Sequence, residues 1–132
     1  VQFGADEELL AHLARCARMH AALGPYLQEL MQEEAQSGTP VMRPLFYHYD
    51  EEKAYTESEE YLLGRDLLIA PVIRQGAGSR TVFLPEDTWV HLFTGKEYAG
   101  GTVKVAAPMG EPPVFVRKGA RSFTELMKVG EI

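Results

Sequence analysis

The hydrophobic pattern of the chain changes its period near Gly64 and Arg65. Before this point apolar residues recur at the three- and four-residue spacing of a helix. After it, short apolar runs alternate with turn residues, as in a succession of strands. A chain with such a change is neither a uniform helical bundle nor a uniform β-domain. We therefore expect an α+β chain in two parts, residues 1–64 and residues 65–132.

The first part is expected to begin with a long helix. Asp6 is placed as its N-cap, and leucines and alanines follow at helical spacing. Gly24 and Pro25 then break or kink the helix, because proline removes a backbone hydrogen bond. A second helical segment, residues 26–36, follows, and Gly38 is suited to its C-terminal cap.

Two shorter elements are predicted before the change of period. The run from Val41 to Tyr49 is rich in apolar and aromatic residues and indicates a short buried strand. Pro44 indicates that strand pairing ends near it, since proline cannot donate to a ladder. Residues 57–63 are predicted to form a short helix that ends at Gly64.

The second part is predicted to be all-β until a short terminal helix. Turn residues separate its apolar runs, which favours an antiparallel sandwich or barrel. Ser122 and Glu125 have the spacing of a capping box, which predicts the terminal helix. The expected strands are 66–73, 80–84, 88–93, 102–107 and 113–117.

Composition excludes several classes of partner. The 132 residues are 45% hydrophobic, enough for a real core, and carry a formal net charge of −6. Nucleic acid and anionic membranes are therefore poor partners. No apolar run approaches the ~20 residues that span a bilayer. Cys16 is the single cysteine and residues 1–4 show no signal-peptide pattern, so we expect a reducing, cytoplasmic location.

The first helix carries three residues of metal-ligand type. His12, Cys16 and His20 are spaced four residues apart and share one helical face. Imidazole and thiolate are ligands for zinc or copper. A structural zinc site needs a fourth ligand, and this helix offers none. We expect the three side chains to serve packing, and we expect neither a metal nor a cofactor.

No catalytic residue is predicted from spacing alone. Acidic clusters occur at residues 7–8, 33–34, 50–52 and 57–60, where we expect solvated faces rather than the apolar setting that raises a carboxyl pKa. Trp89, Phe93 and Tyr98 are expected in the sheet core, with a sugar-stacking surface as the alternative.

Joined motifs give the chain a resemblance to glycoside hydrolase family 31. Residues 38–46 (GTPVMRPLF) and 61–72 (YLLGRDLLIAPV) are similar to the family segments at the end of the catalytic barrel. Residues 23–27 (LGPYL) resemble the preceding helix. Leu84-Pro85, Trp89, Thr94-Gly95 and residues 113–117 (PVFVR) resemble the β-domain that follows. Within the family, the bacterial sulfoquinovosidases are the most similar, on residues 85–91 (PEDTWVH) and 108–113 (PMGEPP).

The resemblance implies a fold for each part. Residues 1–64 would be the end of a TIM-type (β/α)8 barrel, with its eighth strand at residues 40–47, and residues 65–132 an antiparallel β-sandwich domain. Barrel active sites lie at the carboxyl ends of the strands. Tyr47, His48 and Tyr49 are therefore the candidates for a supporting role near the sugar.

The resemblance also implies a function for a larger parent protein. That protein would be a retaining α-glycosidase, a hydrolase of α-glucosidase or sulfoquinovosidase type, with two catalytic aspartates upstream of Val1. No catalytic, cofactor-binding or metal-binding residue is carried onto this chain, which would brace the barrel and be inactive alone. Its partners would be the rest of the parent polypeptide and, in the parent, an α-glycoside. The alternative is a free-standing β-module that binds carbohydrate or protein.

One consequence concerns association of the isolated chain. Without the other barrel strands, several apolar side chains would lose their cover, and exposed apolar patches usually find a partner. We expect self-association through residues 1–49, with a monomer whose helices cover its own β-domain as the alternative. The side chains concerned are Leu9, Leu13, Leu23, Leu27, Leu30 and Val41.

Overall fold

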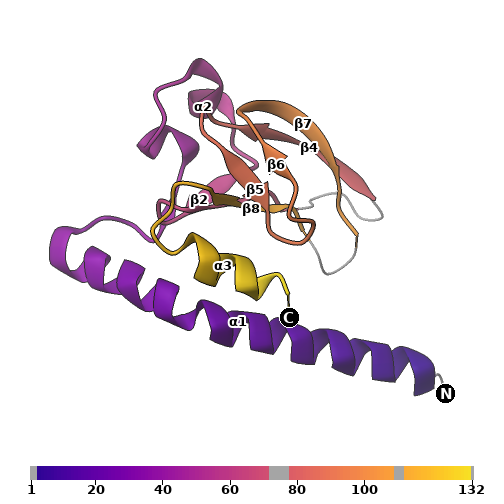
Figure 1. Cartoon of the computed structure of the whole chain (residues 1–132). Helices are drawn as coiled ribbons and strands as arrows, with labels where there is room; N and C mark the ends of the chain where they lie inside the picture. Colours follow the sequence, from indigo (N-terminus) through magenta and orange to yellow (C-terminus); the bar gives the residue numbers. More distant parts are fainter. Residues whose placement is uncertain (1–2, 72–77, 109–111, 132) are drawn as a thin grey trace.

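The computed structural model describes residues 3–71, 78–108 and 112–131 (Figure 1). The helices are α1 (Phe3–Ser37), α2 (Glu52–Thr56) and α3 (Phe123–Val129), with a 3-10 helix η1 (Leu45–Tyr47). The strands are β1 (Met42–Arg43), β2 (Tyr61–Leu63), β3 (Leu67–Ile69), β4 (Ser79–Leu84), β5 (Trp89–His91), β6 (Glu97–Tyr98), β7 (Gly101–Ala106) and β8 (Val114–Arg117). None of the helices in these ranges is long and apolar enough to cross a membrane.

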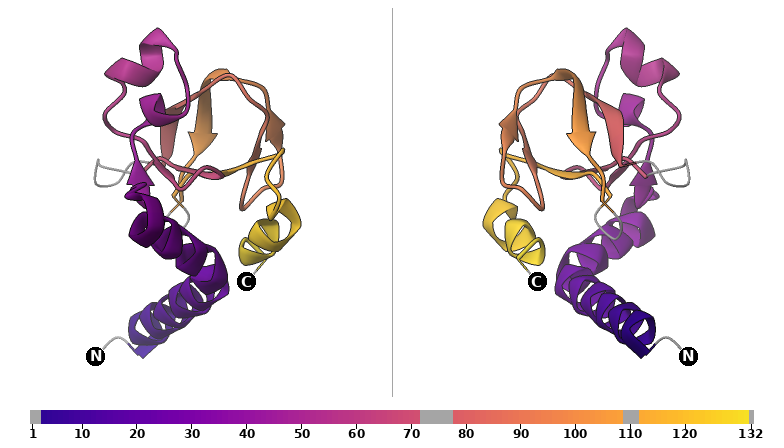
Figure 2. Two further views of the ribbon diagram at one scale, coloured as in Figure 1. Left: turned by 90° about the vertical axis from the view of Figure 1, so that its left-hand side faces the viewer. Right: turned by 90° about the vertical axis from the view of Figure 1, so that its right-hand side faces the viewer.

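The strands form two antiparallel sheets. The larger has six strands in the order β1-β2-β3-β8-β5-β6, and β4 and β7 pair as the smaller one. Helices α1 and α3 lie together on one side of the strands, with α3 closer to them (Figures 1 and 2). The α+β class and the antiparallel arrangement predicted for the second part are thus confirmed.

One face of the six-stranded sheet shares a hydrophobic core with the β4–β7 pair. Leu62, Leu68 and Phe115 are direct cross-strand neighbours on β2, β3 and β8, and all three are fully buried. Full burial of each such side chain stabilises the fold by about 1.5–3 kcal/mol. The buried members of this core are Leu45, Tyr49, Ala54, Leu62, Leu68, Ala70, Val82, Phe83, Leu84, Trp89, Val105 and Phe115.

The opposite face of the sheet packs against the helices. Leu67 and Val116, each one residue away from a member of the first core, point to this side because side chains alternate along a strand. Tyr26 and Leu30 of α1 meet them there. The buried members of this second core are Tyr26, Leu30, Leu67, Leu92, Val116, Leu126 and Val129.

Helix α1 is continuous through Pro25 and bends, as Figure 2 shows. A proline inside a helix removes one hydrogen bond and bends the axis without ending the helix. Gly38 caps the C-terminal end as predicted, with φ of 77° and its N–H donating to the Glu34 carbonyl at 2.8 Å. The prediction of Asp6 as the N-cap is wrong, because the helix already includes Phe3.

The observed strand in this region is much shorter than the one predicted over residues 40–47. Only Met42 and Arg43 form β1, which pairs antiparallel with β2, and η1 follows Pro44 directly. Pro44 has no N–H to continue the ladder. All described strand pairs are antiparallel, and the structure does not show the end of a barrel. The division into residues 1–64 and 65–132 stays a prediction.

The prediction of a helix over residues 57–63 is wrong. A helix does occur in this region, but it is α2 at Glu52–Thr56, and Tyr61–Leu63 form strand β2. Leu62 is fully buried between the two sheets and pairs with Leu68. Packing of this strand outweighs the local preference of an acidic, leucine-containing segment for helix.

The strand predictions of the second part agree with the structure within one or two residues at most ends. The strand expected over residues 66–73 is described as Leu67–Ile69, and its last two residues lie outside the described ranges. Strand β6 was not predicted. The terminal helix is present as α3, but the Ser122 side chain makes no capping hydrogen bond.

The predicted exposure of the α1 leucines is wrong for Leu30, which is only 7% exposed. Leu23 and Val41 are half-buried against the same core. The sheet and α3 provide this cover within one chain. The side chains of Leu9 and Leu13 lie outside the described ones. Self-association of the chain stays a prediction.

Gly64 is expected to be essential for packing of α1 on the sheet. Its φ is 68°, and a Cβ there would meet Leu30 Cδ2 and the Tyr26 hydroxyl at 2.5 Å. We predict that Gly64→Ala lowers the free energy of unfolding by about 2–4 kcal/mol, from backbone strain and overpacking. Denaturant unfolding monitored by circular dichroism measures this value.

The matched control is Gly24→Ala, because a Cβ at Gly24 meets nothing within 4 Å. Alanine at this helical position should stabilise the chain by about 0.5–1 kcal/mol. Equal effects of the two substitutions would contradict the packing account of Gly64.

Candidate functional site

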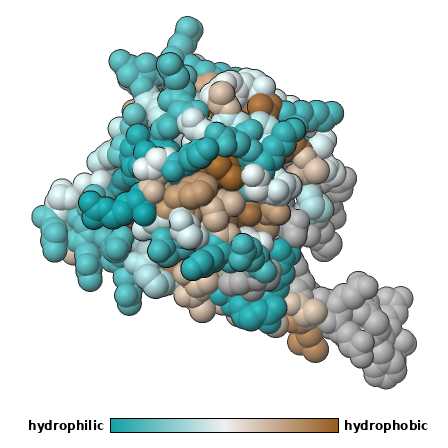
Figure 3. All heavy atoms as spheres, viewed as in Figure 1, coloured by the Kyte–Doolittle hydropathy of each residue, from teal (hydrophilic) through white to brown (hydrophobic). Residues whose placement is uncertain are grey.

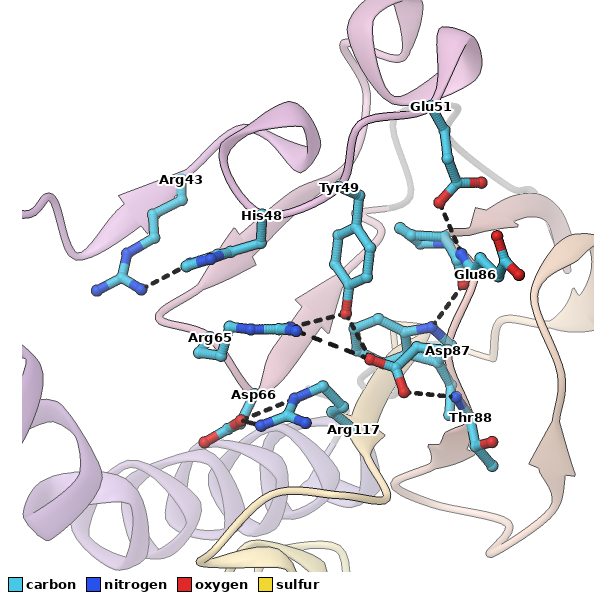
Figure 4. Close-up of polar contacts among 12 residues, drawn as sticks. Arg43, His48, Tyr49, Glu51, Arg65, Asp66, Glu86, Asp87, Thr88 and Arg117 are labelled. Atoms are coloured by element: carbon cyan, nitrogen blue, oxygen red, sulfur yellow. Dashed lines mark hydrogen bonds and ion pairs between the residues drawn. The ribbon is translucent and has the colours of Figure 1, made fainter.

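A polar network joins the segment after η1 to two turns of the β-domain (Figure 4). The buried Tyr49 donates its hydroxyl hydrogen to Asp87 Oδ2 at 2.9 Å and accepts from Arg65 Nη1 at 2.7 Å. Arg65 Nη2 lies 3.9 Å from the same Asp87 oxygen, and Asp87 Oδ1 accepts from the Thr88 N–H at 2.8 Å. Burial raises the pKa of Tyr49 to about 12, so it remains a neutral phenol.

A second part of the network surrounds Arg43 on β1. The guanidinium is 3% exposed and donates from Nε to the Pro40 carbonyl at 2.6 Å. Its Nη2 pairs with Glu33 of α1, and its Nη1 lies 2.9 Å from His48 Nε2. Burial, together with Arg65 and Arg43, lowers the pKa of His48 to about 4. His48 is therefore neutral near pH 7, and its Nε2 accepts from Arg43 because arginine only donates.

A third contact ties the β2–β3 turn to β8 and α1. Asp66 Oδ1 accepts from Arg117 Nη2 at 2.7 Å and from Nε at 3.1 Å. Tyr26 of α1 donates its hydroxyl hydrogen to the Leu63 carbonyl at 2.7 Å and accepts from the Asp66 N–H at 3.2 Å. Burial raises the pKa of Tyr26 to about 12.

A small pocket of about 210 Å³ lies between α1 and this network. It is smaller than the roughly 300–1,000 Å³ typical of ligand pockets. Its lining mixes both charges, so it offers no field of one sign to an ionic ligand. The lining residues are Tyr26, Glu29, Leu30, Glu33, Arg43, Arg65 and Asp66.

The network is suited to fixing loops rather than to proton transfer. Asp66 and Asp87 each face an arginine, and Glu51 accepts from the Glu86 N–H at 2.7 Å. These ion pairs and hydrogen bonds hold the carboxylates in position. The geometry therefore supports a structural function: it locks the turns that follow η1, β2 and β4 to one another.

The structure separates the three residues expected to support a sugar site. Tyr49 is buried in the core and His48 is half-buried against Arg43, whereas Tyr47 is 44% exposed. Only Tyr47 presents much of its ring to solvent. A role for any of the three beside a bound sugar stays a prediction.

The aromatic residue and the metal-ligand candidates named from the sequence lie in different surroundings. Trp89 is fully buried and donates from Nε1 to the Pro85 carbonyl at 3.0 Å, which confirms its place in the sheet core. His20 is exposed on α1, while the side chains of His12 and Cys16 lie outside the described ones. Across the described side chains, no group of three or more His, Cys, Asp or Glu is placed to hold a metal ion.

Glu60 corrects the prediction that the acidic clusters are solvated. This residue is only 4% exposed, and its Oε1 accepts from the Phe83 N–H at 2.7 Å. Arg80 Nη2 is 3.8 Å away, and Oε2 has no hydrogen-bond partner among the described residues. A prediction of a strand at residues 61–63 would have indicated that Glu60 is buried. In a strand, residues 60 and 62 share one face, and that face meets the core.

Burial raises the pKa of Glu60 to about 7, and the charge of Glu57 adds to the increase. The Phe83 N–H, Arg80 and Lys53 oppose it. The folded chain therefore binds a proton that the unfolded chain has released between about pH 4.5 and pH 7. Glu60 stabilises the fold fully below this window and loses its contribution as the pH rises through about 7.

We predict that Glu60→Gln becomes more stable relative to the native chain as the pH rises through this window. The glutamine amide oxygen still accepts from Phe83 but never ionises. Thermal unfolding of both chains between pH 4 and pH 8 measures the difference. Glu59→Gln, at an exposed neighbour, should show no such trend. Parallel pH profiles for Glu60→Gln and the native chain would contradict the account.

Comparison with known proteins places this chain in a family. The profile described as "Glycosyl hydrolase family 31 C-terminal domain" matches residues 38–120. The sulfoquinovosidase of Escherichia coli K12 is 52% identical over 117 residues, which cover 88% of this chain and 17% of that protein. The sulfoquinovosidase of Agrobacterium fabrum is 44% identical over 136 residues, covering 98% and 20%.

A solved structure agrees over the whole chain. The family 31 sulfoquinovosidase of E. rectale, in complex with an aza-sugar inhibitor, superimposes with a TM-score of 0.93 at 45% identity. The match covers 99% of this chain and 20% of that protein. The chain thus spans about a fifth of the length of these relatives. From its profile match and these identities, the chain belongs to glycosyl hydrolase family 31 and carries the C-terminal domain of that family.

Proposed function

We propose that this chain is part of a retaining α-glycosidase, of sulfoquinovosidase or α-glucosidase type, and that it braces the catalytic barrel of that enzyme. The observation that carries the proposal is the match to a sulfoquinovosidase over 99% of this chain but only 20% of the other. Four-fifths of such an enzyme therefore lies outside the region matched here. The partners of this chain would then be the rest of the polypeptide and, in the parent enzyme, an α-glycoside substrate.

The chemistry of glycoside hydrolysis favours a structural role for this chain over a catalytic one. A retaining enzyme uses two carboxyl groups about 5–5.5 Å apart, one as nucleophile and one as acid and base. Asp66 and Asp87 face arginines, and Glu60 lies between the two sheets rather than in a cleft. Under this proposal, both catalytic aspartates would lie before Val1.

The position of α1 supports the bracing function. Tyr26 and Leu30 pack on the β-sheet through one part of the helix, while the N-terminal half extends beyond the β-domain (Figure 1). We propose that this extended half belongs to the outer helical layer of the barrel. The helix would then connect barrel and β-domain as one rigid element, fixed by the Tyr26 hydrogen bonds at the β2–β3 turn.

A free-standing module that binds carbohydrate or protein is the alternative. The burial of Trp89 removes the largest candidate sugar-stacking ring from the surface, which favours the bracing function. The coding sequence upstream of Val1 separates the two. Two catalytic aspartates in one open reading frame support the enzyme, and a start codon directly before Val1 supports the module.

We predict that the 132-residue chain alone hydrolyses no α-glycoside. The test is incubation with aryl α-glucoside and aryl α-sulfoquinovoside, with the parent polypeptide as the positive control. No product should form above background, because the proposal assigns the required pair of carboxyl groups to the rest of the parent polypeptide. Turnover that co-purifies with the chain and disappears when it is denatured would contradict the proposal.

A further inference from the structure

The carboxyl group of Glu60 links the two sheets. Strand β4 pairs with β7, and no other described strand pairs with it. The Phe83 N–H of β4 donates to Glu60 Oε1 at 2.7 Å, and Glu60 directly precedes β2 of the large sheet. A side chain of the large sheet therefore satisfies a backbone group of the small one.

Arg80 makes a second link from β4 to the large sheet. Its Nη1 donates to the Pro71 carbonyl, just beyond the end of β3, and its Nε donates to the Thr81 carbonyl at 3.3 Å. The remaining nitrogen, Nη2, lies 3.8 Å from Glu60 Oε1, which is beyond hydrogen-bond distance. The side chain of Arg80 is only 12% exposed. Arg80 is thus next to the Glu60 carboxyl group but is hydrogen-bonded to carbonyls.

The second carboxyl oxygen of Glu60, Oε2, is buried and has no hydrogen-bond partner within the described part of the chain. If Glu60 ionises here, a buried charge is left without its full set of hydrogen bonds, which costs free energy. Burial accordingly raises the pKa of Glu60 to about 7. Glu60 therefore changes its charge close to neutral pH, and the ionised form requires a partner that it lacks in this arrangement.

The charged groups that act on Glu60 belong to α2 and β4. Glu57 and Lys53 act from α2, and Arg80 acts from β4. The edge of the molecule at α2 is hydrophilic in Figure 3. The Lys53 side chain is 55% exposed there and lies 4.0 Å from Glu57, so solvent and Glu57 weaken its effect on Glu60. Arg80 is therefore the cation that an ionised Glu60 would bind.

We propose that Glu60 and Arg80 form a proton-linked switch between the two sheets. With Glu60 neutral, Arg80 donates to the Pro71 carbonyl, as in the structure. When Glu60 releases its proton to water, the guanidinium moves to the carboxylate and leaves Pro71. The buried carboxylate attracts the guanidinium as a full charge, which a neutral carbonyl does not. Pro71 is half-buried, so water can replace Arg80 on its carbonyl at little cost.

The switch would control the end of strand β3. Ala70 directly precedes Pro71, and its N–H donates to the Pro113 carbonyl at 3.0 Å. When Arg80 leaves Pro71, this hydrogen bond loses the neighbouring link to β4 and should open more often. The end of β3 is then held more firmly below about pH 7 than above it. This inference goes beyond the proposed function and does not depend on it.

Hydrogen–deuterium exchange tests the switch in the polypeptide that contains this chain, at its natural length. Exchange of the peptides that contain Ala70 is measured for the native protein and for Glu60→Gln, in which the amide oxygen still accepts from Phe83 but never ionises. The ratio of the two rates cancels the intrinsic effect of pH. It should be near one at about pH 5 and rise about tenfold at about pH 8.5, as expected for loss of a hydrogen bond from a charged donor. A ratio that does not change with pH would overturn the proposal.

Two further variants separate the switch from a general effect of charge. Glu59→Gln, at an exposed neighbour, should keep the full response to pH, and its loss there would assign the response to surface charge. In an Arg80→Gln background, the native residue and glutamine at position 60 should give equal exchange at both pH values, because no guanidinium is left to change partner. A response that survives without Arg80 would contradict the proposal.

Crystal structures of the same polypeptide on both sides of neutral pH show the exchange of partners directly. At about pH 5 the Arg80 guanidinium should lie within hydrogen-bond distance of the Pro71 carbonyl, and at about pH 8.5 within hydrogen-bond distance of a Glu60 oxygen. An Arg80 that keeps the same partner at both pH values would show that ionisation loosens the sheet without a switch, and the inference would be wrong.

Discussion

The six-stranded antiparallel sheet has two apolar faces, and the rest of the structure depends on covering both. Leu62, Leu68 and Phe115 form one cross-strand row, and the next residues along β3 and β8, Leu67 and Val116, point the other way. Neither face can be left in water without losing about 1.5–3 kcal/mol for each large side chain. The β4–β7 pair covers the first face, and α1 with α3 covers the second.

Polar groups then fix the turns that this layered packing leaves at the surface. Tyr49, Arg65 and Asp87 join three segments that are distant in the sequence, and Tyr26 links α1 to the β2–β3 turn. Buried tyrosines suit this task because their rings add to the core while the hydroxyl reaches a polar partner.

Much of this fold could be predicted from the sequence where one physical signal dominates. The strands near residues 80–84 and 113–117 are bounded by turn residues, and Gly38 has the left-handed conformation of a helix cap. Residues 57–63 were misassigned because their strand is specified by Leu62 packing between two sheets, a contact remote in sequence. The error extended to Glu60, whose burial depends on that strand. Tyr49 gave no local sign of its partners, Arg65 and Asp87.

The most direct test of the supporting role is removal of residues 38–132, the region that begins with the family match, from the parent polypeptide. Deletion uncovers Tyr26 and Leu30 on α1 and takes away the sheet that they pack on. The account predicts that kcat/KM for an aryl α-glycoside and the thermal midpoint both fall sharply compared with the full-length enzyme. A truncated enzyme with unchanged kcat/KM and thermal midpoint would contradict it.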